Sequence, residues 1–279
     1  MARFMDIETI LQEDARSITR RSRSSFYYPM MLFPGGKREA IFTVYAFCRI
    51  TDDIVDQNGS DAATHLSVWK KELIAAERGY SSYYLLNRVM RVARDFSIPV
   101  QLFHDVIRGM EMDLERREYR TFDELYEYCY CVASAVGLMI IRILGAHHTA
   151  SERFALHAGL ALQLTNTIRD AASDIADGRI YFPVTDRRAF FDNPSAVQDA
   201  LRLQCAEARK QFQLADEAFR AYPSLALFPA RVMENMYRLL LDKIEQTGFT
   251  PTAHRVSLTL SEKIQTAGRT WFDDRPYRG

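Results

Sequence analysis

Two pairs of aspartates stand at helical spacing in stretches that otherwise read as buried helix. Asp52 and Asp56 close one apolar run, and Asp170 and Asp174 follow a second one much further along the chain. Residues four apart on a helix lie on one face, one turn apart, so each pair brings two like charges together. That arrangement is unfavourable unless a cation binds. Mg²⁺ prefers oxygen ligands and is commonly held by one or two carboxylates together with substrate phosphates, so the two pairs predict a site for Mg²⁺ and a diphosphate.

Polar neighbours of the aspartates strengthen this interpretation. Arg49 and Arg169 stand shortly before the two pairs, and a guanidinium offers a planar fork of donors to phosphate. Asn166 lies one turn before Asp170 and adds an uncharged oxygen on the same face. The alternative is that each pair lies on a solvated surface and binds nothing. This alternative explains an isolated pair better than it explains two pairs beside apolar runs.

Aromatic and small residues lie on segments close to these motifs. Phe26, Tyr45 and Tyr128 are examples, and the residues between 133 and 137 are mostly small. Metal-assisted loss of diphosphate from an allylic carbon leaves a carbocation, which needs a dry pocket whose aromatic faces stabilise it. Small residues would let an isoprenoid tail pass close to the backbone. The alternatives are ordinary core packing for the aromatics and close helix–helix packing for the small residues.

The composition limits the kinds of partner. The chain has 279 residues, of which 48% are hydrophobic, and basic and acidic residues are equal in number, 36 of each. Nucleic acid is therefore not an expected partner, because proteins that bind the phosphate backbone carry a basic excess. Arginines do cluster between residues 16 and 23. They form either a solvated helix face or a cationic lip that meets an anionic ligand or lipid headgroups.

Cysteine usage and the lack of an apolar leader predict a cytoplasmic protein. The four cysteines are scattered, and Cys129 and Cys131 point to different sides of a helix, so they cannot share a zinc ion. Buried thiols in a reducing compartment explain them better. No N-terminal segment resembles a signal peptide, and no apolar run approaches the roughly 20 residues that span a bilayer. Contact with a membrane is therefore expected to be peripheral.

The distribution of proline and glycine predicts one all-helical domain over the whole chain, with about eight helices. A capping box at Thr121 starts one helix, and Gly145 is expected to end it. Strand signals are weak, because no alternating run is bounded by hairpin turns. The N-terminal arm 1–20 and the C-terminal tail 262–279 are expected to be peripheral.

Around these residues the chain resembles the squalene/phytoene synthase family, whose members join two prenyl diphosphates head to head. The resembling segments follow in order at residues 24–28, 45–56, 109–114, 128–137 and 162–183. The resemblance implies an all-α isoprenoid-synthase fold, a helical bundle around a central apolar cavity. It also implies Mg²⁺ as the cofactor, with Mn²⁺ as a substitute.

Roles for individual residues follow from the same resemblance. The positions that match metal ligands are Asp52, Asp56, Asn166, Asp170 and Asp174. The four aspartates count as catalytic together with Tyr45, Arg49 and Tyr128, and Tyr128 matches a tyrosine assigned to cation stabilisation or proton handling. The substrate-binding set is Arg23, Phe26, Val136, Gly137, Gln163, Asn166, Arg169, Arg179 and Tyr237.

Two positions depart from the family pattern. Ser173 stands where an acidic residue usually precedes the last aspartate, so one oxygen ligand is lost or replaced by a hydroxyl or a water. Ser134 stands where the family usually has a glycine, and it is expected to narrow the tunnel. Both changes bear on rate and product.

The leading hypothesis is Mg²⁺-dependent 1′–1 condensation of two farnesyl diphosphates to presqualene diphosphate or squalene, a hopanoid precursor. The alternative substrate is geranylgeranyl diphosphate, which would give the carotenoid precursor phytoene, and tunnel length decides between them. Reduction with NADPH is not supported, because the chain has no Gly-x-Gly-x-x-Gly fingerprint. A single-substrate terpene cyclase and a non-catalytic relative that acts as an assembly protein remain as alternatives. A membrane surface and downstream isoprenoid enzymes are the expected partners for release of a lipid product.

Overall fold

The protein, represented by a computed structural model, is built of helices over the residues that the structure describes. The structure describes residues 15–21, 30–31, 33, 35–57, 59–115, 118–184, 190, 193–249 and 255–274. The α-helices with defined bounds are α2 (Ala15–Arg21), α4 (Gly35–Gln57), α5 (Ala62–Glu77), α6 (Tyr84–Asp95), α7 (Gln101–Leu114), α8 (Phe122–Cys129), α9 (Ala135–Leu144), α10 (Thr149–Ala176), α12 (Pro194–Ala221), α13 (Phe228–Gln246) and α14 (Leu260–Asp273). Two 3₁₀ turns, η1 (Gly59–Asp61) and η3 (Leu225–Leu227), and a π-helix, η2 (Tyr130–Ser134), add to them. No strand occurs in these ranges, which confirms the all-α prediction.

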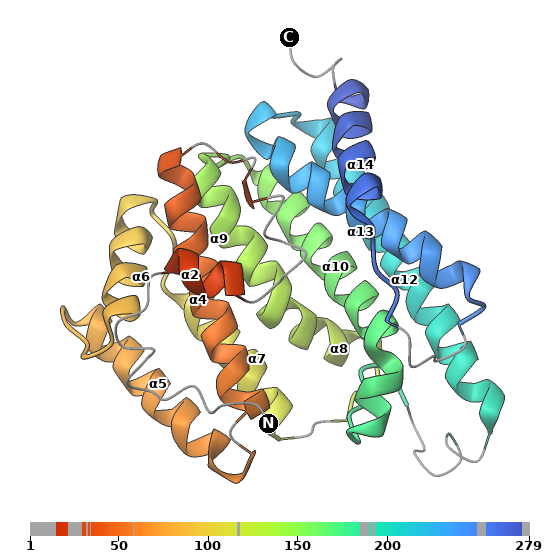
Figure 1. Cartoon of the computed structure of the whole chain (residues 1–279), viewed down its shortest axis with the longest axis horizontal. Coiled ribbons are helices and arrows are strands. Elements are labelled where there is room, and N and C mark those ends of the chain that lie inside the picture. Colours follow the sequence, from red (N-terminus) through yellow and green to blue (C-terminus); the bar gives the residue numbers. More distant parts are fainter. Residues whose placement is uncertain are drawn as a thin grey trace.

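Helices α4, α9 and α10 form the centre of the bundle (Figure 1). Helix α4 contacts α5, α6, α7 and α9, while α10 packs against α8, α9 and η2 and most extensively along α12. Helix α13 contacts α10 and α12 and carries α14. The C-terminal ends of α4 and α10, which bear the two aspartate pairs, lie at the lower end of the bundle in Figure 1.

Local signals fix both ends of the segment that contains α8 and α9. Thr121 caps α8, because its hydroxyl oxygen accepts from the backbone NH of Glu124 (3.2 Å), and the Glu124 carboxylate accepts from the NH of Arg120 (2.8 Å). Gly145 ends α9 at φ 79°, a left-handed conformation that glycine adopts without strain. The helix start predicted at Thr121 and the stop predicted at Gly145 are confirmed, but the Glu124 carboxylate accepts from Arg120 and not from Thr121, as a capping box would require.

Small residues let the central helices approach closely at η2. A Cβ at Gly109 of α7 would lie 2.5 Å from Val132 Cγ1, and one at Gly159 of α10 would lie 2.5 Å from Ser134 Cα. Ser134 is buried and donates its hydroxyl to the carbonyl of Leu156 (2.8 Å). The expectation that Ser134 narrows the tunnel is wrong, because this side chain packs against α10 and does not line the apolar cavity described below.

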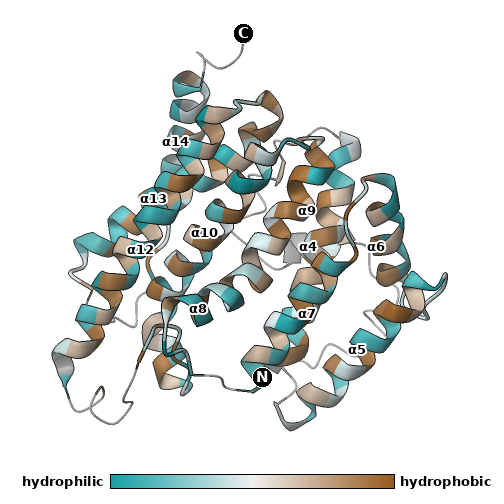
Figure 2. Ribbon diagram, turned by 180° about the vertical axis from the view of Figure 1, so that it is seen from behind, coloured by the Kyte–Doolittle hydropathy of each residue, from teal (hydrophilic) through white to brown (hydrophobic). Residues whose placement is uncertain are grey.

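One stretch within the described ranges is long and apolar enough to cross a membrane. It runs from Phe122 to Leu144, with a mean hydropathy of 1.6 over an 18-residue window, and the expectation that no such run exists is therefore wrong. The stretch comprises α8, η2 and α9, and α9 is one of the more hydrophobic parts of the ribbon in Figure 2. It packs against α7 and α10, and it contributes to both hydrophobic clusters of the bundle, as a core helix does.

Helix α14 is more firmly attached than expected for a peripheral tail. Asn235 of α13 donates to Thr270 Oγ1 over 2.9 Å. Asp274 is 9% exposed and lies 3.8 Å from Arg231 Nε. The tail therefore contributes polar contacts to the bundle as far as Asp274. Residues 1–14 of the expected arm and residues 275–279 lie outside the described part of the chain.

Candidate active site

Carboxylates from three helices gather at the lower end of the bundle. Asp52 and Asp56 come from the last turns of α4, Asp113 from the end of α7 and Asp174 from the end of α10. Arg179, just after α10, connects them, since its Nη1 lies 3.2 Å from Asp56 Oδ1. Asp113 interacts electrostatically with both Asp56 and Asp174. The fold thus brings the ends of the two motif helices to one region, the carboxylate cluster of Asp52, Asp56, Asp113 and Asp174.

Asp113 is a candidate site residue that sequence reasoning missed. Its carboxylate accepts hydrogen bonds from Tyr181 Oη (2.6 Å) and Tyr128 Oη (3.1 Å). The rings of the two tyrosines are stacked, with centroids 5.1 Å apart. Asp113 lies in the segment 109–114 that resembles the family, and that was the available signal, because a lone aspartate on a helix otherwise suggests a solvated position.

Withdrawal from water raises the proton affinity of Asp52, Asp113 and Asp174. Burial, and then the charge of Asp56, raises the pKa of Asp52 to about 7. Burial also raises the pKa of Asp113 to about 6, although hydrogen bonds from the two tyrosines act in the opposite direction. The pKa of Asp174 is raised to about 6, again mainly by burial. A cation bound here would therefore displace protons.

We expect the metal-free protein to lose stability as the pH rises from about 4 to about 7. Aspartates in the unfolded chain ionise near pH 4, whereas these three ionise near 6 to 7 in the folded protein. The stability that these three carboxyl groups contribute is therefore fully present below the pKa of the unfolded chain. It is lost as the pH rises through their pKa values in the folded protein. The loss will be modest for Asp52, whose side chain is 43% exposed and screened by solvent. Melting temperatures across this range measure the effect, and Mg²⁺ with inorganic diphosphate should diminish it. A metal-free melting temperature that rises over the same range would contradict the expectation.

Asp170 is neutralised by two arginines. Arg169 donates to it from Nε (2.9 Å), and Arg255 forms a two-pronged pair with distances of 2.8 and 2.9 Å. Burial alone would raise the pKa of Asp170, but these arginines outweigh burial and lower the pKa. Arg255 was not predicted, because it stands 85 residues after Asp170 and only the fold brings the two together.

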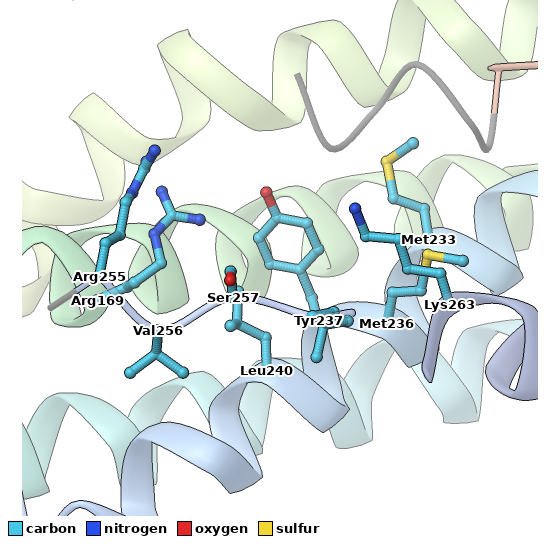
Figure 3. Close-up of a pocket in the computed structure, with 10 residues that line it drawn as sticks. Arg169, Met233, Met236, Tyr237, Leu240, Arg255, Val256, Ser257 and Lys263 are labelled. Atoms are coloured by element: carbon cyan, nitrogen blue, oxygen red, sulfur yellow. The ribbon is translucent and has the colours of Figure 1, made fainter. Parts of the chain in front are cut away.

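A small basic cavity of about 70 Å³ adjoins this pair. Figure 3 shows Arg169 and Arg255 side by side at one end of it, with the Tyr237 ring and Lys263 further along. The three cationic side chains and the phenol lie among apolar lining residues such as Met233 and Leu240. Both arginines pair with Asp170 here, so a phosphate group would have to compete with that carboxylate for the guanidinium forks.

Asn166 presents an oxygen without a hydrogen-bond donor. Its Oδ1 is buried and accepts no hydrogen bond within the described ranges, while its amide nitrogen lies 3.4 Å from Gln163 Oε1. Burial raises the pKa of the neighbouring Tyr237, and hydrogen bonds from Arg169 and Asn166 act in the opposite direction. The unsatisfied Asn166 oxygen suits a cation or a water bound to one.

These donors fit Mg²⁺ that enters together with a diphosphate. Among the residues the structure describes, no three His, Cys, Asp or Glu side chains converge closely enough to hold a metal ion by themselves. The aspartates of α4 and α10 and the free oxygen of Asn166 are hard donors of the kind that Mg²⁺ prefers. Mg²⁺ commonly takes one or two carboxylates and fills its other positions with water and substrate phosphates.

An apolar cavity of about 230 Å³ runs along α4, α9 and α10. On α10 its lining recurs at helical spacing from Asn166 back to Phe154, a distance of about 18 Å along the helix axis. On α4 it runs from Cys48 back to Ile41. The polar end of the cavity is therefore the end nearest the aspartates, and Phe154 and Ile41 stand at the far, apolar end. The remaining lining residues are Met30, Phe33, Val44, Tyr45, Val132, Ala133, Val136, Gly137, Ile140, Ile141, Ala155, Ala158, Gly159, Leu162, Gln163, Ala230, Met233 and Glu234.

The structure brings several predicted site residues to this cavity. Tyr45, Val136, Gly137, Gln163 and Asn166 all line it. A Cβ at Gly137 would lie 3.0 Å from the carbonyl oxygen of Ala155, so glycine there also allows α9 to approach α10 closely.

Other predicted residues lie elsewhere. Tyr128 is 5% exposed, does not line the cavity, and faces Asp113 instead. Arg49 pairs with Asp52 (3.2 Å) and with Asp53 (2.5 Å), so a phosphate must compete with these carboxylates for it. Arg23 and Phe26 lie outside the residues that the structure describes.

Ser173 adds no ligand to the carboxylate cluster. Its hydroxyl, on an exposed part of α10, donates to the carbonyl of Asp170 over 2.8 Å. A serine in this position satisfies the backbone of its own helix. The second aspartate motif therefore has one oxygen ligand fewer than the family pattern, which usually has an acidic residue at position 173.

Comparisons with known proteins agree with this geometry. A family model described as squalene/phytoene synthase matches residues 19–262. The phytoene synthase of Arthrospira platensis is 32% identical over 85% of this chain and 84% of its own length. The chloroplastic phytoene synthase 3 of Zea mays is 34% identical over 91% of this chain, which spans 64% of that relative. A crystal structure of a dehydrosqualene synthase has the same fold, with a TM-score of 0.83 over 94% of this chain and 96% of that one, at 23% identity.

Proposed function

Because the chain belongs to the squalene/phytoene synthase family, we propose that it is a prenyltransferase that joins two prenyl diphosphates in a 1′–1 condensation. The observation that carries this proposal is the apolar cavity that begins at the polar residues Gln163 and Asn166 and continues along α10 to Phe154. A molecule with a diphosphate head and a hydrocarbon tail matches such a site. A carboxylate cluster without the cavity, or the cavity without the cluster, would not favour this chemistry.

The residues at the polar end of the cavity have different roles in the reaction. When bound, Mg²⁺ neutralises the leaving diphosphate, and Asp52, Asp56, Asp174 and Asn166 would hold it, together with Asp170 once that carboxylate leaves Arg169 and Arg255. Arg169 and Arg255, once they release Asp170, bind phosphate oxygens through their donor forks. Arg49 and Arg179 do the same once they release the carboxylates with which they pair here.

The bond-forming steps take place in the apolar part of the site. Departure of diphosphate from one substrate leaves an allylic cation, and the C2–C3 double bond of the second substrate captures it. Loss of a proton then closes a cyclopropane ring. The lining of Val136, Ile140 and Leu162 excludes water from the cation, and Tyr45 offers an aromatic ring beside it. Tyr128, held by Asp113, is assigned to the handling of the proton.

Cavity length favours the shorter substrate. An extended farnesyl chain spans roughly 14 Å and a geranylgeranyl chain roughly 19 Å, with carbon–carbon bonds of about 1.5 Å. The lining from Asn166 to Phe154 extends about 18 Å along α10, and the diphosphate takes up part of that length. We therefore propose farnesyl diphosphate as the substrate. Geranylgeranyl diphosphate is the second candidate, because curated relatives at 32% and 34% identity carry the name phytoene synthase.

The function is tested by incubating the purified protein with Mg²⁺ and either farnesyl or geranylgeranyl diphosphate, with and without NADPH, and identifying the products by mass spectrometry. A C30 product from farnesyl diphosphate supports the proposal, and the cyclopropyl diphosphate is expected whether or not NADPH is present. A C40 product alone would assign the longer substrate. A C15 or C20 hydrocarbon would identify a cyclase, and no product from folded protein would identify a non-catalytic relative.

Shortening the side chain at the far end of the cavity should change the substrate preference. Phe154 is 1% exposed and packs against Phe219, with ring centroids 6.1 Å apart. Phe154→Leu should admit a longer tail and shift the product ratio from C30 towards C40 by roughly tenfold, because each buried methylene contributes about 0.8 kcal/mol. Equimolar competition between the two substrates measures the ratio.

A matched control keeps this prediction specific. Leu162→Val shortens a lining residue near the polar end and should leave the ratio unchanged. Phe154→Leu is preferred to alanine, because deletion of a buried phenylalanine costs about 3–5 kcal/mol and endangers the fold. An unchanged ratio in a folded Phe154→Leu protein would show that another residue limits chain length.

A further inference from the structure

A single charged residue contributes to the wall of the apolar cavity. Among the described residues that line the cavity, Glu234 of α13 alone carries a charge. Its side chain is 0% exposed to solvent. Burial of a carboxylate in an apolar wall is unfavourable unless other groups compensate for its charge. The surroundings of Glu234 must therefore supply that compensation.

Glu234 belongs to a closed ring of ion pairs between α12 and α13. Arg231 donates to Glu234 Oε2 (2.5 Å) and to Asp216 Oδ1 (2.8 Å). Arg238 completes the ring, since its Nη2 lies 2.7 Å from Glu234 Oε1 and 2.8 Å from Asp216 Oδ2. Each of the two carboxylates therefore bridges two guanidinium groups. These four residues are called the ion ring below.

The ion ring places its negative charge nearest to the cavity. Neither arginine of the ring lines the cavity, nor does Asp216. Burial raises the pKa of Glu234, while the two arginines act in the opposite direction. The carboxylate is ionised in this arrangement, because its protonation would leave a buried guanidinium charge without its partner. A cation in the cavity is therefore attracted by Glu234 more than it is repelled by the arginines behind it.

Glu234 lies one helical turn beyond the polar end of the cavity. Tyr237, three residues later on α13, hydrogen-bonds with Asn166 and Arg169 and lines the basic cavity. Along α13 the residues of the apolar cavity come before those of the basic cavity, in the same order as along α10. Three residues of helix span about 4.5 Å. Glu234 is therefore displaced from the polar end by about that distance, towards the apolar part.

Positive charge develops at this depth in the proposed reaction. The allylic carbon is joined to the diphosphate through one oxygen, so the cation forms directly beside the polar end of the cavity. A fixed anion next to a developing cation lowers the barrier most where water is excluded. A free carboxylate would also trap the cation as an ester. Glu234 is hindered from doing so, because both of its oxygens accept hydrogen bonds from the arginines.

We propose that Glu234 stabilises the allylic cation electrostatically, through a carboxylate that the ion ring keeps charged and unreactive. This inference rests on the proposed function, because it concerns the cation of that reaction. The aspartates act on the diphosphate, whereas Glu234 acts on the carbon skeleton. The alternative is that the ring only ties α12 to α13. Asp216 shares that structural role but does not line the cavity, so the two carboxylates can be compared.

Single-turnover kinetics of Glu234→Gln and the matched control Asp216→Asn test the proposal. Each change removes one negative charge from the ion ring and keeps the size of the side chain. Glu234→Gln should lower the rate of the chemical step roughly tenfold and leave the Kd of the substrate within about twofold, because the lost interaction is made with the cation. Asp216→Asn should change the rate by at most about twofold. Equal falls in both variants would assign the ring a structural role and overturn the proposal.

A double variant separates the effect on the cation from damage to the fold. Glu234→Gln leaves two buried arginines with one carboxylate and so lowers stability. Glu234→Gln with Arg238→Gln removes one charge of each sign, and its melting temperature should lie closer to that of the wild-type protein. Its chemical step should still be slower than in the wild-type protein, because the lost carboxylate lines the cavity and the lost guanidinium does not. A folded double variant with the wild-type rate would overturn the proposal.

Binding of a cationic analogue provides a measurement without turnover. The probe is a tertiary amine with a farnesyl chain, which is protonated at neutral pH, and the reference is the neutral ether of the same length. Calorimetry gives the ratio of the two Kd values. Glu234→Gln should lower the preference for the amine roughly tenfold, and Asp216→Asn should leave it within about twofold. An unchanged preference in folded Glu234→Gln would overturn the proposal.

The two measurements keep this inference separate from the proposed function. If the wild-type protein forms its C30 or C40 product and Glu234→Gln forms it at the same rate, the role of Glu234 is refuted and the proposed function stands. If the wild-type protein forms neither product, the proposed function is refuted. The preference for the amine then still decides whether Glu234 makes the cavity selective for cations.

Discussion

Replacing Asp52 and Asp56 together with asparagine is expected to lower product formation by roughly a thousandfold or more, because charge neutralisation at the leaving diphosphate contributes several kcal/mol. Asparagine retains the size of the side chain and removes its negative charge. The helix should be unharmed, since the substitution also removes the mutual repulsion that raises the pKa of Asp52. The measurement is C30 product formed per enzyme at saturating substrate and Mg²⁺.

Thermal unfolding separates loss of metal from loss of structure in the same variant. Mg²⁺ with inorganic diphosphate should raise the melting temperature of the wild-type protein, because a ligand that binds the folded state stabilises it. The double variant should lose that rise while melting at or above the metal-free wild-type temperature. Asp199→Asn is a suitable control, since Asp199 pairs with Arg202 on an exposed part of α12 (2.8 Å). An undiminished rise in the double variant would place the metal elsewhere.

Tyr128→Phe is expected to lower turnover by roughly a hundredfold, the low end of what a positioned proton-transfer group contributes. The hydroxyl is buried and donates to Asp113 over 3.1 Å, and burial holds the pKa of Tyr128 well above its ordinary value. The phenol is therefore neutral and can share a proton with that carboxylate. Phenylalanine removes this oxygen and preserves the stacking with Tyr181.

Comparison with Tyr181→Phe distinguishes a direct role from a positioning role. Tyr181 donates to the same carboxylate over 2.6 Å, so both variants remove one donor from Asp113. A fall in turnover confined to Tyr128→Phe assigns the effect to the Tyr128 oxygen. Equal falls would assign it to the state of Asp113, and unchanged turnover in both would remove the tyrosines from the mechanism. The rise of melting temperature with Mg²⁺ and diphosphate should persist in both variants, in contrast to the aspartate pair.

The parts of the site that follow from local periodicity were predictable from the sequence. The spacing of Asp52 and Asp56, and of Asp170 and Asp174, needed only the helical repeat and the apolar runs beside it. The cap at Thr121 and the stop at Gly145 likewise depend on a few neighbouring residues. The all-α class followed from the same patterns and is confirmed.

Contacts between distant segments were not predictable in this way. Arg255 reaches Asp170 only because the chain returns after α13, and Asp113 becomes important only where Tyr128 and Tyr181 converge on it. Tyr128 was expected to stabilise the cation or to handle a proton, and its hydrogen bond to Asp113 favours the second role. Ser134 was expected in the tunnel and packs on Gly159 instead. The direction of its side chain depends on the π-helix η2, which the sequence pattern does not predict.

That turn, η2, has a consequence for how such a cavity can be redesigned or can diverge. A π-helix holds one residue more per turn than the surrounding α-helix, so residues after Ser134 are rotated relative to those before Tyr130. Deleting a single residue within 130–134 would remove this extra residue and restore a regular helix, so that α9 would keep the face that it now turns to the cavity. A regular α-helix formed over 130–134 without a deletion would instead turn α9 by about 100°. Val136, Gly137 and Ile140 would then leave the lining as a group. The π-helical turn therefore determines which face α9 presents to the cavity, whereas point substitutions change that face one side chain at a time.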